Sequence, residues 1–165
     1  MSLGPQAERL RRQVLSGLPM TLWMWKSLPL AAFAGLRVKR LDDEACAVRL
    51  PGGWRTQNPF RSTYFAAQAM AAEMSTGAPA LVLIADTPAS VAMLVVGLEA
   101  SYSKKAVGET VFTFEDVAGM HETIETAAAA SEPQTFLARS VGRDGAGDEV
   151  AAFEITWSFK RRSTG

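Results

Sequence analysis

Glu73 is the residue of this sequence whose surroundings most favour chemistry. It lies in the stretch YFAAQAMAAEMST (residues 64–76), among alanine, methionine and phenylalanine side chains. A carboxylate buried there without a partner is costly to ionise, so its pKa should rise. A raised pKa suits a general base that activates water, or a carboxylate that attacks an acyl carbon directly. The alternative is an exposed Glu73, or one paired with Arg55 or Arg61.

The loop before this stretch carries further polar groups. Residues 51–63 (PGGWRTQNPFRST) are rich in Gly, Pro, Asn and Arg. Asn58 could orient a water molecule, or it could cap the loop. Arg55 and Arg61 could bind a carboxylate or a phosphate, or they could be solvated surface residues.

The start of the helix predicted over residues 64–76 offers a third kind of group. The first backbone N–H groups of a helix have no partner within the helix, and they lie at its positive end. Near Tyr64, Phe65 and Ala66 they could bind an oxygen that becomes negative during a reaction. The Tyr64 hydroxyl could donate a hydrogen bond, or the ring could simply pack.

Other chemistries have little support. His121 is the single histidine, and its context HETIE lacks the second histidine of a zinc-protease helix. Cys46 is the single cysteine and lies in a strand pattern, where it fits a small core residue. No glycine-rich phosphate-binding loop occurs. We therefore expect no metal and no bound cofactor.

Composition limits the partners. Lys plus Arg and Asp plus Glu number 17 each, so net charge gives no reason to expect nucleic acid. One cysteine allows no internal disulfide and no leading apolar run is visible, so we expect a cytoplasmic protein. The apolar segment 79–98 is interrupted by Pro79, Asp86 and Pro88, so we expect no membrane span.

Helices are expected first along the chain. Residues 5–17 have leucine and valine at helical spacing, and residues 20–28 form a second short run that Pro29 should end. Trp23 and Trp25 in the second run are too apolar for water. They could cover the core or a partner subunit.

The central helix and the strands follow. Residues 64–76 are rich in alanine and should end at Gly77, with Ser62 or Thr63 as the cap. Small side chains on nearly every face suit a helix that a sheet encloses. The strands are expected as a hairpin over 36–50 that turns at Asp42-Asp43, and over 91–103, 106–115, 134–143 and 149–160, with a helix at 118–130. We therefore predict an α+β fold in which an N-terminal helical segment (1–34) packs on one domain (35–165).

The stretch from Leu28 to Gly77 and the later run SYSKKAVGE resemble the hotdog-fold superfamily, in particular its DUF4442 and phenylacetyl-CoA-type thioesterase-like branch. This resemblance implies an antiparallel sheet wrapped around a central helix. It also implies a homodimer whose sheets join edge to edge, with sites at the subunit interface. Whether dimers pair into tetramers is left open. The implied ligand is an acyl-CoA thioester or a related acyl molecule.

Thioesterases of that type carry an Asn, then His-Gly-Gly at the helix start, then an acidic residue. Here Asn58 stands at the first position, Tyr64-Phe65-Ala66 at the second and Glu73 at the third. The resemblance thus implies catalytic Glu73, Asn58 and Tyr64, with Phe65, Ala66 and Arg61 binding substrate or the oxyanion. The histidine and both glycines are replaced. This departure favours the alternative function, a non-catalytic hotdog protein that binds an acyl or lipid ligand.

Overall fold

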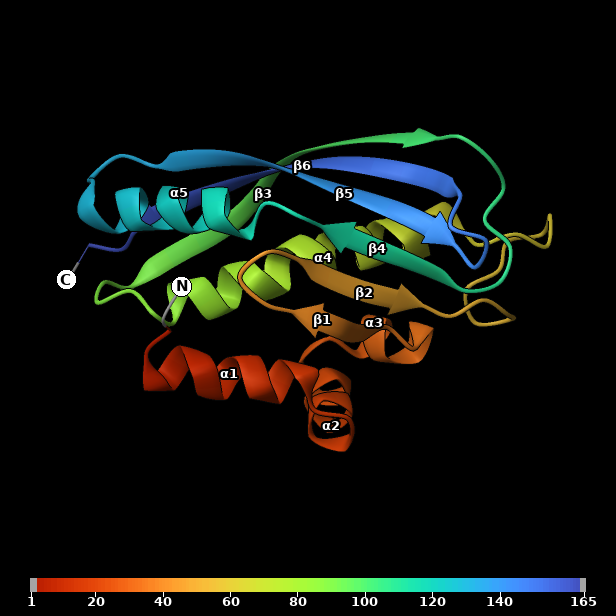
Figure 1. Ribbon diagram of the computed structural model, residues 1–165, viewed down its shortest axis with the longest axis horizontal. Coiled ribbons are helices and arrows are strands. Elements are labelled where there is room, and N and C mark those ends of the chain that lie inside the picture. The colour runs from red at the N-terminus through yellow and green to blue at the C-terminus, as the bar shows by residue number, and fades with distance from the viewer. Residues whose placement is uncertain (1–2, 164–165) are drawn as a thin grey trace.

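A curved sheet wraps around one long helix, and three further helices lie below it (Figure 1). The computed structural model describes residues 3–163. The elements are α1 (Pro5–Leu15), α2 (Leu18–Ser27), α3 (Pro29–Ala34), β1 (Arg37–Leu41), β2 (Cys46–Leu50), α4 (Phe65–Ile84), β3 (Val91–Tyr102), β4 (Thr110–Phe114), α5 (Val117–Ala129), β5 (Gln134–Asp144) and β6 (Glu149–Arg161).

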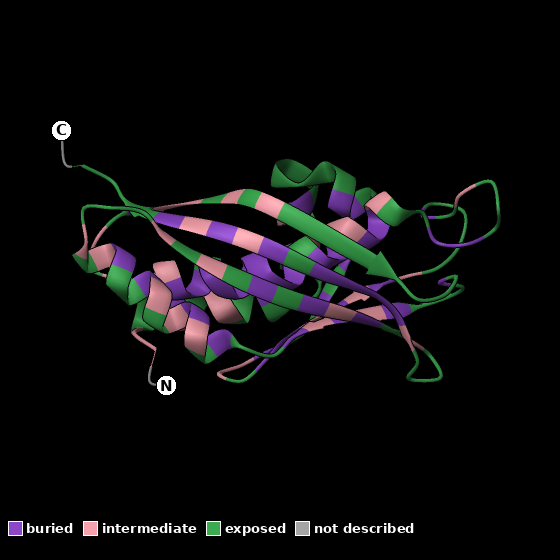
Figure 2. Cartoon of the chain, turned by 90° about the horizontal axis from the view of Figure 1, so that it is seen from above, coloured by how far each residue is buried: buried purple, intermediate pink, exposed green. Residues whose placement is uncertain are grey.

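The six strands form one antiparallel sheet in the order β1-β2-β4-β5-β6-β3. Buried and exposed residues alternate along its central strands (Figure 2). In β6 the side chains of Phe153, Ile155, Trp157 and Phe159 are buried, with polar residues between them. Period-two burial of this kind places one face against a core. The predicted α+β hotdog arrangement, a sheet around a central helix, is confirmed.

The central helix is longer than predicted. It does not end at Gly77 but continues through Gly77 and Pro79 to Ile84. A Cβ on residue 77 would lie 3.4 Å from the Trp157 ring, so the glycine here permits close packing and does not end the helix. Ala80, Val82 and Leu83 beyond it are buried. Their burial favours continued helix despite the backbone hydrogen bond that proline cannot make.

The second short helix ends before Pro29, as expected, because α2 ends at Ser27 with Leu28 as its C-cap. Pro29 is then the first residue of α3, a position that suits proline because its N–H would be unpaired anyway. The predicted cap of the central helix was wrong. Ser62 and Thr63 do not cap α4. Tyr64 is the residue before the first turn, and no side chain caps it.

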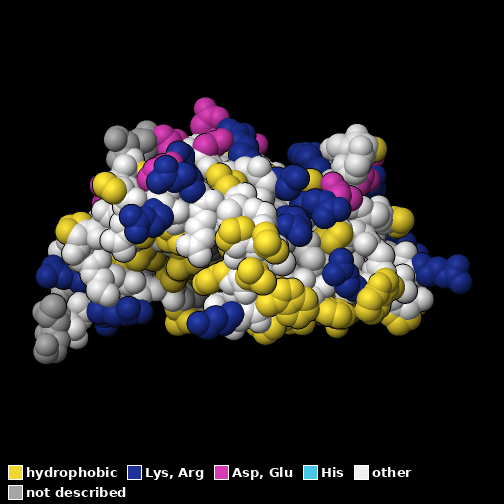
Figure 3. All heavy atoms as spheres, turned by 90° about the horizontal axis from the view of Figure 1, so that it is seen from below, with side chains coloured by type: hydrophobic (Ala, Val, Ile, Leu, Met, Phe, Trp, Pro, Cys, Tyr) yellow, Lys and Arg dark blue, Asp and Glu magenta, His cyan; other side chains and the backbone are white. Residues whose placement is uncertain are grey.

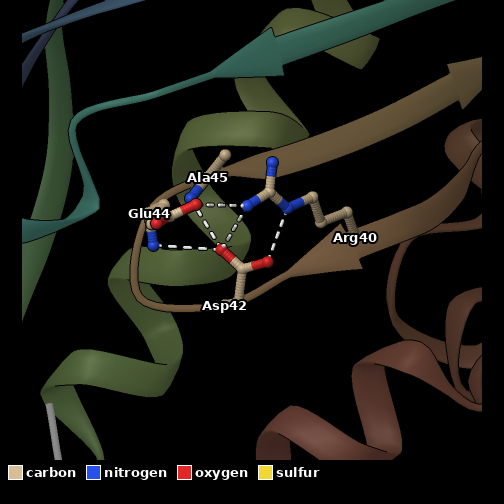
Figure 4. A network of polar contacts seen from close by, with 4 residues as sticks. All are labelled: Arg40, Asp42, Glu44 and Ala45. Carbon is tan, nitrogen blue, oxygen red and sulfur yellow. Dashed lines mark hydrogen bonds and ion pairs between the residues drawn. The ribbon is translucent and has the colours of Figure 1, made fainter.

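The β1–β2 hairpin turns at Asp42, as expected (Figure 4). Asp42 Oδ1 accepts hydrogen bonds from the backbone N–H groups of Glu44 and Ala45, each at 3.0 Å. Its Oδ2 lies 2.5 Å from Arg40 Nε. The hydrogen bond from Arg40 is the main cause that lowers the pKa of Asp42 to about 2.

The N-terminal helices cover the open side of the central helix. α1 contacts α4 and β1, while α2 packs on α3 and α1. No described helix is both long enough and apolar enough to cross a bilayer. Residues 1–2 and 164–165, which belong to the predicted segments 1–34 and 35–165, lie outside the described residues.

Candidate functional site

A cavity of about 380 Å³ lies between the N-terminal helices and the central helix. α1, α2, α4, β3 and β6 all contribute to its wall. The wall is almost entirely apolar, and its residues are Leu10, Gln13, Val14, Met20, Trp23, Ser27, Leu28, Glu73, Met74, Gly77, Ala78, Leu81, Met93 and Trp157. A cavity of this size and character is typical of a site for a small apolar ligand.

Glu73 is the charged residue of that wall. Its side chain is exposed, as the alternative of an exposed Glu73 expects, yet the protein atoms around it still raise the pKa of its carboxyl above the ordinary glutamate value through desolvation. Its Oε1 would lie 3.2 Å from a Cβ on residue 77, so the carboxylate sits directly against Gly77. Within residues 3–163 it forms no ion pair, so the alternative pairing with Arg55 or Arg61 does not occur.

Hydrogen bonds fix the segment that carries Glu73. The Trp157 indole N–H donates to Thr76 Oγ1 at 2.9 Å, and Thr76 Oγ1 donates to the Glu73 carbonyl oxygen at 3.0 Å. At the residue before Thr76, the hydroxyls of Ser75 and Ser140 lie 2.8 Å apart. These buried bonds tie α4 to β6 and β5, so the part of the helix that carries Glu73 is held against two strands.

The N-terminus of α4 has free donors. The Tyr64 N–H donates to the Thr56 carbonyl at 2.7 Å and is therefore engaged. Across the described part of the chain, no acceptor faces the N–H groups of Phe65 and Ala66. The rings of Tyr64 and Phe65 pack edge to face, 4.9 Å between centroids, and both are about half exposed. This helix end can therefore accept an anionic oxygen.

Asn58 holds the loop before that end. Its Oδ1 accepts from the N–H of Phe60 and from both the N–H and the hydroxyl of Ser62. These bonds favour loop positioning over the orientation of water. Arg61 is exposed, has a left-handed φ of 59°, and lines a separate hollow with Thr63 and Val107.

Within one chain, Glu73 does not meet the predicted site residues at and before the start of α4. Phe65 and Glu73 are eight residues apart on one helix, about 12 Å along its axis. Asn58, Arg61, Tyr64, Phe65 and Ala66 are all absent from the cavity wall.

The wall formed by the N-terminal helices was not predicted from the sequence. Gln13, Met20 and Trp23 reach the cavity, yet the second helix was expected to cover either the core or a partner. The sequence signal for this wall was the helical spacing of apolar residues in α1 and α2. Leu10 and Val14 share one face of α1, and Met20 and Trp23 share one face of α2, so both helices present an apolar stripe.

Comparison with known proteins gives a family and a fold. The family described as "Domain of unknown function (DUF4442)" matches residues 20–159. Among the curated proteins, no sequence matches.

Solved structures match over nearly the whole chain. One is PA5026 from Pseudomonas aeruginosa, described as a protein of unknown function and probable thioesterase. It has a TM-score of 0.72 and 18% identity, over 91% of this chain and 99% of that one. Another is the thioesterase HI1161 from Haemophilus influenzae, with a TM-score of 0.64 and 11% identity, over 88% and 91%. At such identities the likeness extends to the thioesterase-like fold alone.

Proposed function

Because this chain belongs to the DUF4442 family and has a thioesterase-like hotdog fold, we propose that it hydrolyses an acyl-CoA thioester with Glu73 as base or nucleophile. The observation that carries this proposal is the position of Glu73. It is a carboxylate with a raised pKa in the wall of an apolar cavity beside the central helix. The acyl chain occupies that cavity.

As a base, Glu73 takes a proton from water while the water oxygen bonds to the thioester carbon. The carbonyl oxygen becomes negative and accepts hydrogen bonds from the N–H groups of Phe65 and Ala66. The carbon–sulfur bond then breaks and CoA leaves as the thiolate. Tyr64 contributes a hydroxyl donor near the oxyanion, Asn58 positions the loop, and exposed Arg61 binds phosphate groups of CoA.

This reaction needs Glu73 and a helix N-terminus closer together than one chain places them. We assign the second helix end to another copy of the chain, in a homodimer whose sheets join at β3. β3 is an edge strand of 12 residues. A long edge strand with apolar side chains is a ready site for pairing with another chain.

The inner face of β3 supports this assembly. After a bulge between Val95 and Gly97, Leu98 pairs with buried Ile155 and Tyr102 pairs with buried Ala151. Leu98 and Tyr102 therefore face the core side of the sheet, yet each remains nearly half exposed. No element of the described chain covers them, and a partner subunit joined at this edge could.

The test is replacement of the carboxylate. Glu73→Ala and Glu73→Gln should each lower thiol release from acyl-CoA substrates by about 10²–10⁴-fold, because the base is lost. Glu154→Gln, at an exposed carboxylate on β6, is the matched control and should keep the wild-type rate. Circular dichroism should show that all three variants fold.

Two outcomes would contradict the proposal. An unchanged rate in Glu73→Ala would remove Glu73 from the chemistry. Wild-type protein that binds acyl-CoA without any thiol release would favour the second function, a non-catalytic acyl-binding protein. The replaced His-Gly-Gly motif supports that second function, since Tyr64 and Phe65 place large rings at the helix start.

A further inference from the structure

The surface of α2 and α3 exposes more hydrophobic side chains than a free surface should. Along α2, Leu18, Leu22 and Trp25 follow helical spacing on one face and are 69%, 62% and 53% exposed. α3 adds Leu30, which is 66% exposed, and Phe33. Figure 3 shows hydrophobic side chains gathered on this lower side of the molecule. We call these five residues the α2–α3 face.

α2 is apolar on its opposite face as well. There Met20 and Met24 are buried, and Met20 and Trp23 line the cavity. A helix with apolar side chains on two opposite faces is normally covered on both of them. The protein encloses one apolar face of α2. The other apolar face is exposed and would be stabilised in an apolar environment.

The charged residues nearest to this face in the sequence are all basic. Residues 9–41 contain seven Lys or Arg and no Asp or Glu, although the whole chain has 17 of each kind. Lys26 lies in the last turn of α2, and Arg37 Nη1 donates to Thr21 Oγ1 of the same helix at 3.3 Å. The Arg55 guanidinium lies 3.1 Å from the position of a Cβ on Gly35, at the end of α3. Three cations therefore border the α2–α3 face.

A second copy of the chain does not suit this face. In a two-fold dimer the same patch meets itself, so its cations would face cations without carboxylates to offset them. Leucine and tryptophan side chains framed by Lys and Arg are instead the composition of helices that lie in a membrane interface. Anionic lipid headgroups supply the opposite charge.

We propose that the α2–α3 face binds the surface of an anionic lipid bilayer, with Leu18, Leu22 and Trp25 entering the headgroup region. Lys26, Arg37 and Arg55 contact the lipid phosphates. No element spans the bilayer in this arrangement, because α2 lies along the surface. Since Leu28 closes α2 and also lines the cavity, the docked face brings the cavity wall close to the lipid.

The experiment is sedimentation of the full chain with vesicles of phosphatidylcholine alone or with added phosphatidylglycerol. Wild-type protein should bind the anionic vesicles, bind the neutral ones at least about tenfold more weakly, and lose binding as salt rises. The tryptophan emission of the protein should shift to shorter wavelength on binding, because the Trp25 ring leaves water.

Two variants separate the apolar and charged contributions. Leu22→Ser with Trp25→Ser should remove most of the binding. Lys26→Glu with Arg55→Glu should weaken binding to anionic vesicles by at least about tenfold. The matched controls are Leu137→Ser on β5 and Lys105→Glu in the β3–β4 loop, both exposed and remote in sequence from this face. They should bind as wild type does.

The proposal is overturned if wild type does not sediment with anionic vesicles, or if the control variants lose binding to the same extent. It is also overturned if the Leu22→Ser, Trp25→Ser variant turns a larger oligomer into a smaller one without changing lipid binding, since a second copy would then cover the face. Thiol release in solution is measured in parallel. Its presence or absence tests the proposed hydrolysis independently of lipid binding.

Discussion

The two ends of the candidate site on α4 are built differently. Around Glu73 the helix is enclosed, and hydrogen bonds through Thr76 and Trp157 tie it to the sheet. Around Phe65 the helix start is open, its first N–H groups are unengaged, and its aromatic rings are exposed.

Under the proposed mechanism, the difference indicates which half of the site one chain would complete. Glu73 is exposed at the cavity, but the protein atoms around it still raise the pKa of its carboxyl by desolvation. Donors for an oxyanion must remain free until substrate arrives, so they belong on an accessible surface. An enclosed end and an open end, about 12 Å apart, fit a site closed by a second subunit.

At the open end of α4, the largest expected effect comes from removing one backbone donor. Phe65 is the first residue of α4, where proline fits, and α1 and α3 both begin with proline. Tyr64 before it has φ −65° and ψ 136°, which a following proline tolerates. Phe65→Pro should lower kcat for thioester hydrolysis by about 10²–10³-fold, because the N–H is lost.

Phe65→Ala is the control, since it removes the ring and keeps the N–H. It should lose far less activity than Phe65→Pro. Equal losses in both variants would mean that the ring, and not the backbone donor, matters at this end.

Mixing two inactive variants tests whether Glu73 of one subunit acts together with the α4 N-terminus of the other subunit. A heterodimer of Glu73→Ala and Phe65→Pro subunits would keep one site with both groups intact. After subunit exchange, the mixture should recover up to about a quarter of the wild-type rate, since half of the dimers are mixed and each has one good site. No recovery, with exchange demonstrated, would place both groups in the same subunit.

A smaller effect is expected in the loop. Asn58→Ala removes an acceptor of three hydrogen bonds and should lower the free energy of unfolding by about 1–2 kcal/mol. Asn58→Asp keeps the accepting oxygen and should retain both stability and activity in thermal melts and thiol-release assays. If Asn58→Asp is stable but inactive, then the Asn58 amide takes part in the reaction itself.

The smallest effect concerns stability at the enclosed end. Glu73 has a raised pKa in the folded chain, so ionisation lowers stability as pH rises from the ordinary glutamate pKa through the raised value. Glu73→Gln should therefore be slightly more stable than wild type at neutral pH. The difference should vanish below about pH 4, where the wild-type carboxyl is protonated in both states. Thermal melts across this range measure it, and a constant difference would contradict burial as the cause.

Sequence patterns predicted the sheet well because burial in it has a simple period. Phe153 to Phe159 alternate with polar residues, and that alternation alone identified β6. The end of α4 could not be predicted in the same way. Gly77 and Pro79 are ordinary signals of a helix end, and it is packing against Trp157 and the burial of residues beyond Pro79 that explain why the helix continues.

The sequence predicted one residue of the candidate site, Glu73, but not the residues around it. Glu73 stands out in sequence because its neighbours are apolar, and the structure places it in an apolar wall. Its partners in that wall come from α1 and α2, distant in sequence. No local pattern shows that Gln13 or Trp23 would lie across a cavity from it.

The distribution of charge has a consequence for how the molecule moves. Ten of its 17 basic residues lie between Arg9 and Arg61, while ten of its 17 acidic residues lie between Glu109 and Glu154. A molecule with no net charge feels no net pull in a uniform field, but separated charges experience a torque. If the α2–α3 face binds lipid as proposed, the cations Lys26, Arg37 and Arg55 beside it would turn this face toward a negative surface before contact.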